Sequence, residues 1–190
     1  MFKRHPSGLS RRDLCRAAPI VMLTLSLPGG ALAATASEID AKADNALDSL
    51  YRTNEGARAL ADKAKGVLIF PSIIKGGFVL GGAYGQGALR VGGKTVGYYN
   101  SVAASYGLQI GVQSFSYTLL LMTDEALAHV QKSDGWELGV GPSIVVADEG
   151  FGKKASTTTL QSDIYAFIFG QEGLMAGLGI EGSKITRIER

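Results

Sequence analysis

The hydrophobic residues between Ser37 and Lys65 recur at the spacing of a helix. Ser37 and Asp40 have the spacing of an N-terminal capping box, and Asn54, in the sequence TNEG, is a second candidate N-cap. The pattern predicts a helical segment over residues 34–65, formed either by two short helices or by one bent helix. The residues of the apolar face are Ile39, Ala43, Ala46, Leu47, Leu50, Ala57, Leu60, Ala61 and Ala64.

From Gly66 onward the pattern changes to short apolar runs and alternation, which is typical of strands. The first run, GVLIFPSI, is interrupted by Pro71, and Thr123 is the candidate N-cap of one short helix in TDEALAHVQ. A helix long enough for a parallel crossover is missing, except at residues 123–132. The chain therefore predicts an α+β fold: a mainly antiparallel, strongly curved sheet or small β-barrel, with an N-terminal helical segment and one short internal helix. The other predicted strands lie in GLQIGVQSFSYTLLLM, WELGVGPSIVVAD, ASTTTLQSDIYAFIFG and GLMAGLGIEGSKITRIE.

A glycine-rich stretch runs from Lys75 to Tyr99. It lacks the third glycine of a dinucleotide-binding fingerprint, because Arg90 stands there, and it lacks the following helix. It is also too apolar for a solvated linker. We therefore expect a strand pair that turns at Gly92-Gly93, with glycines where the sheet bends or another backbone lies close. The sequences EGFGKK and GQEG have the composition of further hairpin connections.

The first 33 residues have the pattern of a signal peptide: a basic flank, an apolar run too short to span a bilayer, and Ala31 and Ala33 before a cleavage site. Ser10, Arg11 and Arg12 resemble the start of a twin-arginine export motif, although an ordinary Sec signal remains the alternative. We expect a periplasmic or envelope-associated protein with three parts. These are a signal peptide (1–33), a helical segment (34–65) and a β domain (66–190).

Composition places residues 34–190 among globular domains without a strong charge. The whole chain of 190 residues is 46% hydrophobic and 19% charged. Removal of residues 1–33 leaves 14 Lys and Arg against 16 Asp and Glu, a formal charge of −2. A domain near neutrality has no electrostatic footprint for nucleic acid, so we expect none as a partner.

Residues that could carry catalysis are sparse. His129 has no second histidine or cysteine at metal-ligand spacing, and no nucleophile stands in a known motif. Asp163 and Glu181 lie in apolar strands, where we favour a role as structural hydrogen-bond acceptors over a binding-site pair. The sequence therefore predicts no enzyme and no cofactor.

Three blocks of the sequence resemble the SYLF domain, a family also known as the yeast actin-binding type of domain. They are AKGVLIFPSIIKGGFVLGGAYGQGAL (64–89), YGLQIGVQSFSYTLLLMTDEAL (106–127) and DIYAFIFGQEGLMAGLGIEGSKI (163–185). The resemblance implies a non-enzymatic domain that binds lipids, including phosphoinositides and other anionic phospholipids. Eukaryotic members tend to carry basic residues before the last glycine block, whereas this chain has Gly170-Gln171-Glu172. We therefore do not expect phosphoinositide-type recognition at that turn.

The resulting hypothesis is a phospholipid-binding protein that associates reversibly with a membrane surface. The alternative is an envelope interaction protein that binds another protein through its helix or a sheet edge. The candidate lipid contacts are Lys63, Lys65, Lys75, Arg90, Lys94, Phe151, Lys153 and Lys154. These cations could equally form the solvated face of a soluble domain.

Overall fold

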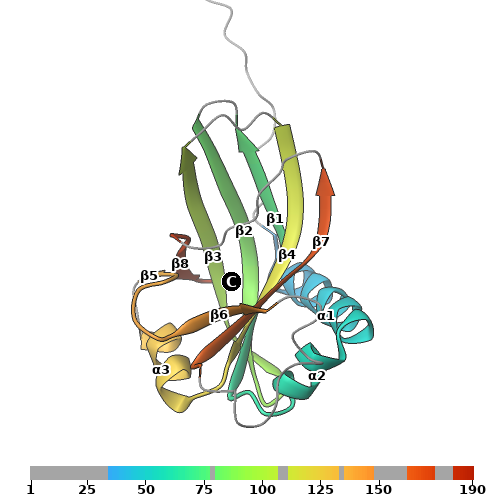
Figure 1. Ribbon diagram of the computed structural model, residues 1–190, viewed down its shortest axis with the longest axis vertical. Helices are drawn as coiled ribbons and strands as arrows, with labels where there is room; N and C mark the ends of the chain where they lie inside the picture. The colour runs from blue at the N-terminus through green and yellow to red at the C-terminus, as the bar shows by residue number, and fades with distance from the viewer. Residues whose placement is uncertain (1–33, 78–79, 107–110, 133–134, 148–161, 174–181) are drawn as a thin grey trace, which may run out of the picture. The chain divides into compact units, whose positions relative to one another are not determined.

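The computed structural model describes residues 34–77, 80–106, 111–132, 135–147, 162–173 and 182–190 (Figure 1). Residues 34–190 make up one compact unit. The predicted signal peptide, with Ser10, Arg11, Arg12, Ala31 and Ala33, lies outside the described residues and stays a prediction.

The first helix, α1 (Ala36–Thr53), begins at a capping box formed by Thr35 and Glu38. The Thr35 hydroxyl accepts from the Glu38 amide at 3.3 Å, and the Glu38 carboxylate accepts from the Thr35 amide at 2.8 Å. The predicted box of Ser37 and Asp40 is wrong, because Ser37 already lies in the first helical turn. Asp40 instead projects its carboxylate to the sheet.

Asn54 ends α1 and begins the second helix, α2 (Glu55–Ala61). Its backbone amide donates to the Leu50 carbonyl at 2.8 Å, while its side-chain oxygen accepts from the Ala57 amide at 2.9 Å. The Asn54 backbone is extended, so α2 starts in a new direction. The prediction of an N-cap at Asn54 is confirmed, and the segment forms two separate helices, of which α1 has 18 residues and only α2, with 7, is short.

The remaining described elements form an eight-stranded sheet and one more helix. The sheet is mostly antiparallel and strongly curled into a half-barrel, which confirms the predicted α+β fold (Figure 1). The strand order is β5-β8-β3-β2-β1-β4-β7-β6. The bounds are β1 (Gly66–Gly77), β2 (Leu80–Val91), β3 (Lys94–Tyr106), β4 (Gly111–Leu121), α3 (Asp124–Lys132), β5 (Trp136–Glu137), β6 (Ile144–Ala147), β7 (Ile164–Gly173) and β8 (Lys184–Ile188).

Two strand pairings differ from the sequence prediction. β6 and β7 pair in parallel, which alternation along the chain does not reveal. The sequence GQEG, predicted as a hairpin connection, continues β7 instead, since Glu172 and Gly173 pair with Ser114 and Gln113 of β4. The predicted connection EGFGKK lies outside the described residues.

Pro71 lies at a bulge in β1. The register of β1 shifts beside it on both sides, against β2 between Ile69 and Ser72 and against β4 between Phe70 and Ile73. Proline has no amide hydrogen for a ladder, so a bulge is where a strand within a sheet tolerates it. The bulge divides β1 into two segments, each with its own register against the neighbouring strands.

The glycines of the stretch from Lys75 to Tyr99 have separate roles. Gly92 and Gly93, with φ of 57° and 77°, form the predicted turn between β2 and β3. A Cβ at Gly85 would lie 2.4 Å from the Ser72 carbonyl oxygen, and one at Gly87 would lie 2.2 Å from that of Ile69. Only glycine therefore fits where β2 passes the bulge of β1.

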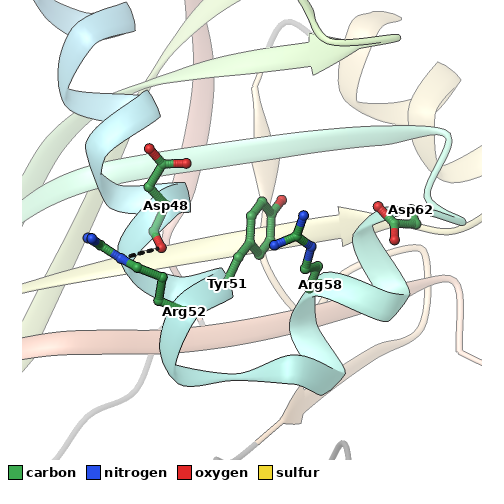
Figure 2. Close-up of a pocket in the computed structure, with 5 residues that line it drawn as sticks. All are labelled: Asp48, Tyr51, Arg52, Arg58 and Asp62. Carbon is green, nitrogen blue, oxygen red and sulfur yellow. Dashed lines mark hydrogen bonds between the residues drawn. The ribbon is translucent and has the colours of Figure 1, made fainter.

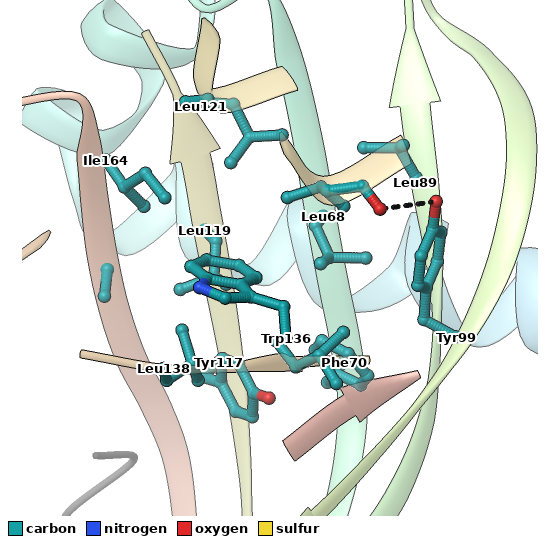
Figure 3. Packing of buried hydrophobic residues seen from close by; sticks show 14 of the residues in the cluster. Leu68, Phe70, Leu89, Tyr99, Tyr117, Leu119, Leu121, Trp136, Leu138 and Ile164 are labelled. Atoms are coloured by element: carbon teal, nitrogen blue, oxygen red, sulfur yellow. Dashed lines mark hydrogen bonds between the residues drawn. The ribbon is translucent and has the colours of Figure 1, made fainter. Parts of the chain in front are cut away.

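The sheet has a core on each face. Leu68 packs with Trp136 and Tyr117 on one face, together with residues of α3, while its neighbour Ile69 packs with Ile39 of α1 on the other. Figure 3 shows the first cluster, in which the Phe70 and Tyr117 rings stack with centroids 4.7 Å apart. The helices α1 and α2 thus cover the face opposite Trp136.

Candidate functional site

A pocket of about 360 Å³ lies where α1 and α2 meet the turn between β2 and β3. We call it the turn pocket. Its walls are mostly apolar, and two of the predicted lipid contacts, Lys65 and Arg90, line it. The lining residues are Leu47, Tyr51, Ala61, Asp62, Ala64, Lys65, Gly66, Val67, Arg90, Gly92 and Gly93.

Arg90 joins α1 to the sheet. Its guanidinium lies 2.5 Å from the Asp44 carboxylate and 3.7 Å from that of Asp40. The Asp40 carboxylate also accepts from the hydroxyls of Thr95 at 2.7 Å and Tyr98 at 2.8 Å. The charge of Arg90 is therefore already paired within the fold, and its side chain is only 17% exposed.

Three predicted lysines lie at or beside the turn pocket. Lys65 is half-exposed, with its ammonium 3.9 Å from the Asp124 carboxylate. Lys63 and Lys94 are exposed, and neither forms an ion pair within the described ranges. Among the predicted contacts that the structure describes, these two are the cations most available to a ligand.

The other predicted contacts do not join this group. Lys75 lies toward the opposite end of β1, where it pairs with Ala83 and Gln113 and is 9% exposed. Phe151, Lys153 and Lys154 lie outside the described residues.

A second pocket, of about 270 Å³, lies between α1 and α2 (Figure 2). We call it the helix pocket. It shares Tyr51 and Asp62 with the turn pocket and adds Asp48, Arg52 and Arg58. None of these residues is among the contacts predicted from the sequence. The spacing of four that separates Asp48 from Arg52, and Arg58 from Asp62, is the signal that could have found them.

Tyr51 stands between the two pockets. Partial burial raises its pKa above the ordinary value, and the nearby Asp62 carboxylate raises it further. The hydroxyl therefore keeps its proton at neutral pH and can donate a hydrogen bond.

Asp163 serves as a hydrogen-bond acceptor at the start of β7. Its carboxylate accepts from the Ser143 amide at 3.0 Å and hydroxyl at 2.8 Å, and more weakly from the Thr123 hydroxyl at 3.4 Å. These bonds lower the pKa of Asp163. They tie the beginnings of β6, β7 and α3 together, as expected for a structural carboxylate.

His129 packs edge-on against Trp136, with ring centroids 5.5 Å apart. Within the described residues, no group of three His, Cys, Asp or Glu side chains is placed to hold a metal ion. None of the helices in the described part of the chain is both long and apolar enough to cross a bilayer.

The C-terminal half of the chain matches a known protein family. Residues 102–189 match the family Ysc84, described as "Las17-binding protein actin regulator". The matched range contains the second and third SYLF-like blocks and begins within β3. No curated protein matches the chain. Both pockets are formed by residues that precede the matched range. The helix pocket is formed by α1, α2 and its C-cap, whereas the turn pocket also includes residues of β1, which pairs with β4 of the matched range.

Proposed function

Residues 102–189 belong to the Ysc84 (SYLF) family, and from this premise we propose a non-enzymatic protein that binds phospholipid surfaces reversibly. The family description names binding and regulation, not a reaction. A non-enzymatic binding role is the coarse function that family membership supports. Phospholipid as the ligand, and the periplasm or envelope as the location, are our proposals.

The observation that carries the phospholipid proposal is the turn pocket. Apolar side chains form its walls, while Lys63 and Lys94 stand exposed nearby and Lys65 lies at its edge. Such an arrangement can hold apolar groups of a lipid while cations meet phosphates above them. Each cation near an anionic membrane surface contributes about 1 kcal/mol, so two free lysines give weak, reversible attachment.

Vesicle sedimentation tests this function. Residues 34–190, which form one compact unit, are mixed with vesicles that contain or lack anionic phospholipid, with the full chain in parallel. We expect sedimentation with anionic vesicles at low salt and its loss at high salt, because exposed charges are screened. A protein that stays in solution with both vesicle types at low salt contradicts the proposal.

The location has its own test, since it rests on residues 1–33. Replacement of both Arg11 and Arg12 by lysine should retain the protein in the cytoplasm if export uses the twin-arginine route. Unchanged export of this variant would favour the Sec route.

A protein partner at a sheet edge is the second candidate. β6 ends the strand order, and Val145 and Val146 are 38% and 49% exposed. Docking through the helical face is less favoured, because the apolar side of α1 is already buried on the sheet. A partner that copurifies with the wild type but not with Val146→Lys supports this function; identical partners for both proteins contradict it.

A further inference from the structure

The helix pocket presents both signs of charge around one tyrosine. Asp48 and Arg52 come from α1, and Arg58 comes from α2, with Asp62 at its C-cap (Figure 2). Two cations and two carboxylates make its formal charge zero. This sets it apart from the exposed lysines beside the turn pocket, which are cations only.

The charged side chains of the helix pocket do not form ion pairs with one another in the described part of the chain. Arg58 and Asp62 lie one helical turn apart, about 6 Å along the axis, a spacing that commonly allows ion pairing. In the described part of the chain neither side chain forms an ion pair or a hydrogen bond. Arg52 donates through Nε to the Asp48 carbonyl at 3.2 Å, not to its carboxylate. Both signs therefore remain available to a ligand.

Arg58 and Tyr51 can act on the same group. In Figure 2 the Arg58 side chain extends toward the Tyr51 ring, and the two groups interact electrostatically. A guanidinium and a protonated phenol both donate hydrogen bonds, and neither carries a negative charge. Such a pair suits a phosphate oxygen. Asp62, which lies beyond Arg58 as seen from Tyr51, offers only carboxylate oxygens as hydrogen-bond acceptors.

The mixed charges select the kind of ligand. A simple anion on Arg58 would be opposed by Asp62, and a simple cation on Asp62 would be opposed by Arg58. A zwitterion whose phosphate and ammonium are joined by two carbon atoms satisfies both side chains at once. The apolar walls of the turn pocket continue beyond Tyr51 and Asp62, which line both pockets.

We propose that the helix pocket binds the phosphoethanolamine headgroup of a phospholipid. The phosphate accepts from Arg58 and Tyr51, the ammonium donates to Asp62, and an acyl chain lies along Leu47, Ala61, Ala64 and Val67 of the turn pocket. This inference rests on the proposed phospholipid function and adds the headgroup that the site selects.

Titration with single-chain lipids below their micelle concentration tests the proposal. The probes are lysophosphatidylethanolamine, lysophosphatidic acid, which lacks the ammonium, and free O-phosphoethanolamine, which lacks the acyl chain. The full chain is measured, with residues 34–190 in parallel. The variants are Arg58→Gln and Asp62→Asn, with Lys132→Gln and Glu125→Gln as charge-matched controls on the exposed side of α3.

We expect Arg58→Gln to lower the affinity for both phospholipids about tenfold, which is the factor that corresponds to one lost charge-assisted contact. Asp62→Asn should weaken only lysophosphatidylethanolamine by about tenfold and leave lysophosphatidic acid equal or tighter. The control variants should bind as the wild type does. Free O-phosphoethanolamine should compete, but more weakly than the lipid, because it lacks the chain.

Three results would overturn the inference. The first is equal wild-type affinity for both phospholipids, with no change of the ratio in Asp62→Asn. The second is an unchanged affinity in Arg58→Gln. The third is an equal affinity for free O-phosphoethanolamine and for the lipid, because the acyl chain would then contribute nothing to binding. If the wild type still sediments with vesicles in these cases, the proposed function stands and only the headgroup assignment fails.

Discussion

Gly87 sets how closely β1 and β2 approach at the bulge. Gly87→Ala would place a Cβ 2.2 Å from the Ile69 carbonyl oxygen and 2.7 Å from the Phe70 ring. Overpacking of this kind costs about 1–3 kcal/mol, so we expect the free energy of unfolding in urea to fall by that amount. Gly82→Ala is the control, because its nearest contact is an ordinary 3.6 Å. Equal stability of the two variants would contradict the close approach.

Asp40 anchors α1 to the sheet through one carboxylate. Asp40→Ala removes the acceptor of Thr95 and Tyr98 and one partner of Arg90. Donors left without partners predict a loss of about 1–3 kcal/mol in unfolding free energy. Asp48→Ala, on the exposed side of the same helix, should change it by less than about 0.5 kcal/mol. A similar loss in both variants would show that the carboxylate network does not stabilise the fold.

Tyr117 makes stability depend on alkaline pH. Burial raises its pKa well above the ordinary value, although the Ser101 hydroxyl, 2.7 Å away, acts in the opposite direction. The unfolded chain therefore ionises this group above about pH 10 while the folded chain does not, and stability falls as pH rises from there. Urea unfolding at pH 8 and pH 10.5 measures the fall. Tyr117→Phe should show a smaller one; an unchanged fall would exclude Tyr117 as its source.

The role of a residue is predictable from the sequence where its hydrogen-bond partners are close to it along the chain. Gly92-Gly93, Asn54 and Thr123 were found from the sequence because turns and caps use fixed offsets. The first cap was misplaced, since Thr35-x-x-Glu38 and Ser37-x-x-Asp40 have the same spacing. What separates them is Asp40, whose partners lie 50 or more residues away on β2 and β3.

At the scale of elements, α1 and α2 cover a face of the sheet. Deletion of residues 37–62 would expose Ile69, Ala88 and Leu120, which now pack under the helices. We expect the truncated chain to lose cooperative urea unfolding, because each buried aliphatic side chain contributes about 1.5–3 kcal/mol. If the truncated domain remains folded and its vesicle sedimentation is unchanged, the helices are not part of the lipid site, and this result favours a protein partner for them.

The strands were more predictable than their pairing. Alternation and apolar runs located most of the strands, because the faces of a strand differ in burial. The sequence WELGVGPSIVVAD, predicted as one strand, instead contains both β5 and β6, which lie at opposite ends of the strand order. Alternation does not specify a neighbour, so the parallel pairing of Ile144–Ala147 with Ile164–Phe167 was missed. In β4, Val112 is 66% exposed while Gln113 is buried, so polarity alone does not assign the faces there.

At the scale of the whole molecule, the candidate site depends on contacts between distant segments. Lys65 and Arg90 line one pocket because α2 returns to the sheet beside the Gly92-Gly93 turn. Lys75 was equally a predicted lipid contact, yet it lies at the end of β1 that is far from this pocket. The sequence could nominate cations, but only the fold shows which ones share an apolar pocket.

The most direct test of the account is vesicle sedimentation of two charge-matched double variants. Lys63→Gln with Lys94→Gln removes two exposed cations beside the turn pocket, whereas Lys132→Gln with Lys184→Gln removes two exposed cations on α3 and β8. At about 1 kcal/mol for each cation, the first variant should bind anionic vesicles about thirtyfold more weakly. The second should bind as the wild type does. Equal binding by the two variants would contradict the assignment of phospholipid binding to the turn pocket.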